Sequence, residues 1–182
     1  MVEARFSQDM IAMLVCCKNT KLISYESEAS NEAGGVYGNM RLNFDGFSME
    51  ITNEEQTMPL FDELEDIACL SCSKVDSSLP FEPMVVTDVK KTPVGHEVES
   101  VEVITDTIDV NGGEYRIAFD MAVIFHMDGA TLMVARDVWF SEMLTIKDND
   151  SFDEIFSVDD VIESWSNDGE YNVTVNREKR MI

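Results

Sequence analysis

The stretch EYRIAFDMAVIFH, residues 114–126, decides the fold. Every second residue in it is large and apolar: Tyr115, Ile117, Phe119, Met121, Val123 and Phe125. The other parity carries polar side chains: Glu114, Arg116, Asp120 and His126. This alternation is typical of a β-strand with one buried face. The stretch is therefore predicted to be the central strand of a sheet.

Turn signals on both sides of this strand predict hairpins. Asn111-Gly112-Gly113 precedes it and Asp128-Gly129 follows it, and such residues adopt the positive backbone dihedrals of tight turns. The segments Val98–Val110, Glu114–Met127 and Ala130–Phe140 should form an antiparallel meander. The apolar parity slips in the first segment at Val103-Ile104, which predicts a bulge or a strand break there.

Apolar spacing of three and four residues predicts helices at about 6–18, 57–72 and 151–166. Ser7, Thr57, Ser151 and Ser157 are the candidate N-caps of these segments. The other elements read as strands joined by hairpins, without the regular helical crossovers of a parallel sheet. The sequence therefore predicts an α+β fold, with an antiparallel sheet covered on one face by about three helices. Residues 1–182 are expected to form a single domain, with a weak subdivision near 74–83.

The charge of the chain is its outlying property. Its 182 residues include 36 acidic and 13 basic ones, a formal net charge of −23. Nucleic acid and anionic membranes need a cationic face, so neither is an expected direct partner. A protein with a basic groove is a suitable partner for so negative a chain. The alternative is that the negative charge serves only solubility.

Composition and motifs bear on the other functional classes. The sequence lacks a signal peptide pattern and any apolar run long enough to span a membrane, which predicts a cytoplasmic protein. Cys16, Cys17, Cys69 and Cys72 are predicted to be reduced thiols, buried rather than zinc-bound, because adjacent cysteines are poor ligand spacing. No phosphate loop, nucleophile elbow or paired metal-binding histidines occur. We therefore expect no enzyme activity, cofactor or metal.

The carboxylates gather in three segments. Residues 45–66 hold eight acidic residues and no basic one, and residues 96–110 add five more, again without Lys or Arg. Residues 142–170 hold ten acidic residues and one lysine. The predicted partner-binding surface takes its residues from the second and third segments: Glu97, Glu99, Glu102, Asp106, Asp109, Asp148, Asp150, Asp153, Glu154, Asp159 and Asp160.

A surface of this kind could imitate the phosphate array of DNA. Duplex DNA carries one charge per ~1.7 Å of axis. Five carboxylates on a strand of about 14 residues average one per roughly 9 Å. One strand is too sparse, so a mimic needs two or three acidic elements that converge on one face.

In size, acidity and lack of catalytic apparatus, the chain resembles the anti-CRISPR proteins that inhibit type II effectors. The resemblance implies a non-enzymatic inhibitor that binds Cas9, with or without guide RNA, and blocks DNA recognition or cleavage. In composition the chain also resembles acidic antirestriction proteins. The alternative function is an acidic cytosolic interaction or oligomerisation domain of a mobile element, such as a homodimer, whose charge serves solubility alone.

Overall fold

The computed structural model describes residues 1–29, 35–60, 63–85, 88–137, 141–167 and 169–182. Strands make up 62% of these described residues and helices 12%. Helices of eight, four and nine residues are the whole helical content of the described residues. The predicted α+β fold, with helices packed on one face of a sheet, is therefore wrong: the protein is built mainly from antiparallel strands.

Eleven strands join in one continuous sheet. In chain order they are β1 (Val2–Ala4), β2 (Lys21–Glu28), β3 (Gly35–Tyr37), β4 (Asn39–Phe44), β5 (Phe47–Leu60), β6 (Glu63–Val75), β7 (Val89–Val110), β8 (Tyr115–Met127), β9 (Ala130–Arg136), β10 (Met143–Asp148) and β11 (Val173–Met181). Their order across the sheet is β3-β10-β9-β8-β7-β2-β4-β5-β6, with β1 paired to β8 and β11 paired to β7. The helices are α1 (Gln8–Val15), α2 (Phe152–Ile155) and α3 (Val158–Ser166).

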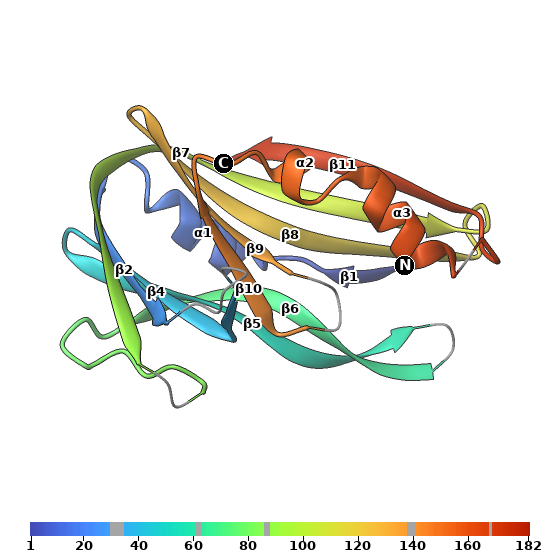
Figure 1. Cartoon of the computed structure of the whole chain (residues 1–182), viewed down its shortest axis with the longest axis horizontal. Coiled ribbons are helices and arrows are strands. Elements are labelled where there is room, and N and C mark those ends of the chain that lie inside the picture. The colour runs from blue at the N-terminus through green and yellow to red at the C-terminus, as the bar shows by residue number, and fades with distance from the viewer. Residues whose placement is uncertain (30–34, 61–62, 86–87, 138–140, 168) are drawn as a thin grey trace.

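The 22-residue strand β7 joins the two layers of the molecule. Its first part, Val89–Glu97, pairs with β2 in the lower layer of Figure 1. Its second part, Val98–Val110, pairs with β8 in the upper layer, and β11 pairs along the other edge of that part. The sheet therefore folds over on itself through one continuous strand.

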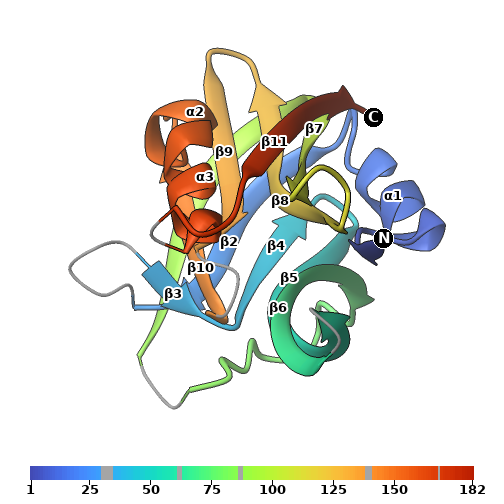
Figure 2. The ribbon, with the colours of Figure 1, turned by 90° about the vertical axis from the view of Figure 1, so that its right-hand side faces the viewer.

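The predicted meander is confirmed, since β7, β8 and β9 pair antiparallel in sequence order. The end of its third segment, Phe140, lies outside the described residues. The single buried face predicted for the central strand is wrong, because Ala118, Asp120 and Ala122 on its other parity are buried too. The reason is that β8 contributes side chains both to a core between the two layers and to a core under α3. Figure 2 shows α2 and α3 on one side of the upper layer.

Two apolar cores result from this arrangement. One lies between the layers, where the Phe125 ring of β8 is 6.2 Å from the Phe44 ring of β4. The other includes Phe119 of β8 and Trp165 of α3, with ring centroids 6.1 Å apart. The fully buried Arg136 places its guanidinium 4.8 Å from the centre of the Phe119 ring, a cation–π contact.

A bulge occurs close to the predicted position, but on the neighbouring strand and for another reason. Ile104 pairs with Ala122 and Thr105 with Asp120, so Met121 is the extra residue. Val103 and Ile104 are both fully buried because β7 has a core on each side. The parity slip in the sequence therefore reflects two buried faces, and β7 needs no break there.

The predicted helix at 57–72 is wrong, because β5 and β6 form a long hairpin. The helical spacing of Leu64, Ile67 and Ala68 is misleading: Leu64 is 74% exposed, whereas Ile67 and Ala68 are buried on opposite faces of β6. Thr57 caps no helix and instead donates a hydrogen bond across the strands to Asp66 at 2.7 Å. Phe61, another residue of the expected apolar face, lies outside the described residues.

The other two predicted helices are confirmed as shorter elements. Ser7 caps α1 by accepting a hydrogen bond from the Met10 N–H. The 151–166 segment divides into α2 and α3, and Ser157 caps α3 by accepting from the Asp160 N–H at 3.1 Å. Ser151 precedes α2 without a side-chain capping bond.

Asp120 anchors the N-terminal segment to the sheet. Its carboxylate accepts hydrogen bonds from the Phe6 N–H and the Thr105 hydroxyl, each at 2.6 Å, and it is 2% exposed. Burial raises the pKa of Asp120, and these hydrogen bonds offset that rise only in part. The folded protein therefore holds this proton to a higher pH than the unfolded chain does.

This shift predicts a pH-dependent contribution to stability. The contribution is fully present below the unfolded-state pKa of aspartate, about 4, and is lost as pH rises through the raised folded-state pKa. Urea unfolding of Asp120→Asn and the parent protein between pH 4 and 7 should show the difference moving in favour of the variant as pH rises. Asp128→Asn, in the exposed β8–β9 turn, controls for the lost charge. Parallel profiles for Asp120→Asn and the parent would contradict this assignment.

Candidate functional site

The acidic residues predicted on the first strand of the meander lie on β7, and three of the five have partners within the protein. Glu102 lies 3.0 Å from His126 of β8, and Asp109 pairs with Arg116 of β8 at 2.7 Å. Asp106 is fully buried and pairs with Arg177 of β11. Glu97 and Glu99 are exposed. The absence of Lys and Arg from this segment is thus offset at Asp106 and Asp109 by arginines from neighbouring strands.

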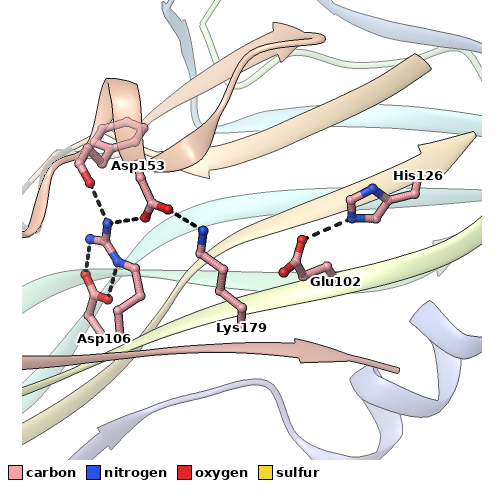
Figure 3. Close-up of polar contacts among 7 residues, drawn as sticks. Glu102, Asp106, His126, Asp153 and Lys179 are labelled. Atoms are coloured by element: carbon pink, nitrogen blue, oxygen red, sulfur yellow. Dashed lines mark hydrogen bonds and ion pairs between the residues drawn. The ribbon is translucent and has the colours of Figure 1, made fainter. Parts of the chain in front are cut away.

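Arg177 of β11 connects β7 with α2 and the segment that follows it. Figure 3 shows two of its partners, Asp106 and Asp153. Its Nε and Nη2 donate to the two carboxylate oxygens of Asp106 at 2.8 and 2.7 Å. Its Nη1 donates to Asp153 and to the Phe156 carbonyl, and its guanidinium lies 4.6 Å from the Phe152 ring centre. Burial alone would lower the pKa of Arg177, but hydrogen bonding to Asp106 and Asp153 raises it overall. Asp106 is therefore part of a buried structural ion pair.

Of the six predicted acidic residues after Lys147, one forms ion pairs among the described residues and five do not. Asp153 contacts both Arg177 and Lys179, and its hydrogen bond to Lys179 is the main reason its pKa is lowered. The other five are exposed, and no ion pair within the described part of the chain includes them: Asp148, Asp150, Glu154, Asp159 and Asp160. These five carboxylates remain available to a partner.

The β5–β6 hairpin forms a further acidic surface, which the predicted site omits. Its distal part carries five described carboxylates and no Lys or Arg: Glu54, Glu55, Glu63, Glu65 and Asp66. Four are exposed and Glu65 is half-buried. The high acid content of residues 45–66 pointed to this surface, but the helix predicted at 57–72 would have spread these charges around its axis.

Pairing of the two strands concentrates this charge. The segment from the Glu54/Cys69 pair to the Leu60/Glu63 pair spans six residue steps, or about 20 Å at ~3.3 Å per residue. Five carboxylates over that length average one per ~4 Å, against one per ~3.4 Å along a single DNA strand. The hairpin thus carries about twice as many carboxylates per unit length as the single acidic segment of residues 96–110, although these carboxylates alternate between two faces.

An apolar residue lies within this acidic surface. Leu64 is 74% exposed, pairs with the exposed Pro59 across the hairpin, and has carboxylates on both sides in sequence. Strands β5 and β6 run side by side along the lower layer toward the lower right of Figure 1. An exposed leucine surrounded by charge matches the usual arrangement of a small interface, with an apolar centre and a polar rim.

Glu142, which precedes β10, extends the acidic region to the base of the hairpin. Its carboxylate accepts a hydrogen bond from the Tyr37 hydroxyl and lies 3.4 Å from the Glu55 backbone nitrogen. The hydrogen bond to Glu142 raises the pKa of Tyr37. The tyrosine therefore stays protonated and adds no charge of its own to this region.

Three of the four cysteines are buried. Cys17, Cys69 and Cys72 are buried, as predicted, whereas Cys16 is exposed. Burial raises the pKa of Cys17 and Cys72 to about 12, which keeps both thiols protonated. Among the described residues, no three His, Cys, Asp or Glu side chains are placed to hold a metal ion together.

No protein-family model, curated protein or solved structure matches the chain. None of the helices in the described residues is long and apolar enough to cross a membrane.

Proposed function

We propose that the chain is a non-enzymatic, cytoplasmic inhibitor that binds the basic surface of a nucleic-acid-handling protein, with Cas9 as the first candidate. Binding would occupy a surface that otherwise contacts DNA, and so block DNA recognition or cleavage. The observation that carries the proposal is the distal part of the β5–β6 hairpin, whose five described carboxylates have no ion-pair partner among the described residues and lie around an exposed leucine.

Electrostatics supports a basic partner in two ways. A net charge of −23 accelerates encounter with a cationic protein and repels nucleic acid. Apart from Asp150, the free carboxylates also occur on β-strands and in short helices, which hold them on a rigid scaffold and reduce the entropic cost of binding. Leu64 would supply the apolar contact that follows the electrostatic encounter.

A second function, self-association, is favoured by the position of β6. This 13-residue strand ends the strand order, so one of its edges has no neighbouring strand in the described sheet. Edge strands of two copies can pair through their backbone groups. Glu63, Glu65 and Asp66 would then face like charges, so self-association should strengthen as salt screens them.

Salt therefore separates the two functions, because it acts on them in opposite directions. Binding to Cas9, with and without guide RNA, should weaken at least about tenfold between about 50 mM and about 500 mM salt. Interferometry on immobilised Cas9 measures this, and sedimentation of the free protein follows self-association. Absence of Cas9 binding at every salt concentration would rule out this partner.

Charge-neutral variants locate the contact. Changing Glu54, Glu55, Glu63, Glu65 and Asp66 to their amides should reduce affinity more than the same change at the five exposed acids after Lys147. Each variant removes five negative charges, so both change the net charge of the protein, and its long-range attraction to a basic partner, by the same amount. A larger loss from the second set would move the interface to the α2–α3 region, and an equal loss would mean that only total charge matters.

A further inference from the structure

A cavity of about 120 Å³ lies between α2, α3 and the upper layer of the sheet. Its walls are mainly apolar and include two aromatic rings from the helical segment and one from the sheet: Phe156, Trp165 and Phe119. Ile108 of β7 and Val161 of α3 complete two of its sides. The cavity is therefore built by packing two short helices on the sheet.

The bulge in β8 shapes this cavity. Met121, the extra residue between the pairs formed by Asp120 and Ala122, lines it together with Phe119. Bulges redirect side chains and are common beside functional sites. Methionine is flexible and polarisable, and its sulfur makes favourable contacts with aromatic rings. The wall at Met121 can therefore adapt to a guest.

The polar side chains of the cavity are two carboxylates and two hydroxyls. Asp137 follows β9, Asp160 lies in the first turn of α3, and Ser157 and Ser164 complete the set. No Lys, Arg or His occurs among the described lining residues. The charge is therefore complementary to a cation and unfavourable for a carboxylate or a phosphate.

We propose that this cavity binds a small aromatic amine, with a single ring inside and a protonated amino group at Asp137 and Asp160. An apolar cavity of about 150 Å³ binds benzene. This cavity is slightly smaller, about 120 Å³, but it opens to solvent, so the amino group can remain at its mouth while the ring enters. The rings of Phe119, Phe156 and Trp165 provide apolar and edge-to-face contacts. The carboxylates accept charge-assisted hydrogen bonds from the ammonium group, which are the stronger kind. This site is separate from the acidic hairpin and does not depend on the proposed function.

The test uses 2-phenylethylamine, which is protonated at neutral pH, and 2-phenylethanol as the neutral analogue of the same shape. Titration of the full-length protein with the amine should produce a saturable shift of the Trp165 indole N–H resonance. The alcohol should bind at least about fivefold more weakly, because it lacks the charge-assisted hydrogen bond. Equal binding of both compounds, or no saturable shift at Trp165 with the amine, would overturn the proposal.

Matched helix variants test the role of the carboxylates. Asp160→Asn should weaken binding of the amine by about fivefold or more and leave that of the alcohol unchanged. Asp159→Asn removes the same charge from the neighbouring residue, which does not line the cavity, and should stay within about twofold of the parent. Equal effects of the two substitutions would show a general field effect and overturn the assignment of Asp160.

Discussion

Replacing Arg177 with leucine is expected to lower the free energy of unfolding by about 3–5 kcal/mol, because the substitution leaves the buried Asp106 carboxylate without its partner. The Asp106 side chain is fully buried and that of Arg177 is 6% exposed, so water cannot take the place of the lost hydrogen bonds. Urea unfolding at neutral pH measures the loss. An unpaired buried carboxyl has a raised pKa, so the variant should also lose stability as pH rises.

Two further variants distinguish this ion pair from a general effect of charge. Arg180→Leu removes a cation from an exposed position three residues along β11 and should change stability by less than about 0.5 kcal/mol. The double variant Asp106→Leu/Arg177→Leu should lose less than the sum of the single variants, since neither charge remains buried alone. Additive single-variant losses would show that the pair is not energetically coupled.

The fold could be predicted from the sequence where local patterns determine it. Asn111-Gly112-Gly113 and Asp128-Gly129 located both turns of the meander, and Ser7 located the start of α1. The β5–β6 hairpin was missed because Ile67 and Ala68 are buried on opposite faces, a pattern that a helix also produces. Burial on two faces depends on which layers cover a strand, and local periodicity does not contain that information.

The candidate site was harder to predict, because charges interact across long sequence separations. Asp106 and Arg177 are 71 residues apart, and a count of acids along β7 cannot reveal that β11 pairs beside it. The acids of the hairpin were counted, but their convergence depends on the pairing of Thr57 with Asp66 and of Leu60 with Glu63. The acidity of the protein was therefore predictable from composition. Which carboxylates form ion pairs and which remain free depends on strand pairing, and only the structure shows that pairing.

The contact between the two layers should depend strongly on Phe125. This residue is fully buried near the C-terminal end of β8, pairs with Val101 and Leu132, and lies against the Phe44 ring of the lower layer. Phe125→Ala removes a ring from a closely packed core and should lower the free energy of unfolding by about 3–5 kcal/mol. Thermal and urea unfolding, followed by near-ultraviolet circular dichroism, measure the change.

Leu64→Ala is the matched control, because it removes an apolar side chain that is 74% exposed. Its effect on stability should be below about 0.5 kcal/mol. The same variant should weaken binding to a basic partner if Leu64 provides the apolar contact of the hairpin. Substitution of Phe125 should therefore change stability, and substitution of Leu64 should change binding. A small loss for Phe125→Ala would mean that the layers are held together mainly by the continuity of β7. In that case, substitutions at the bend of β7, between Glu97 and Val98, should have the larger effect on stability.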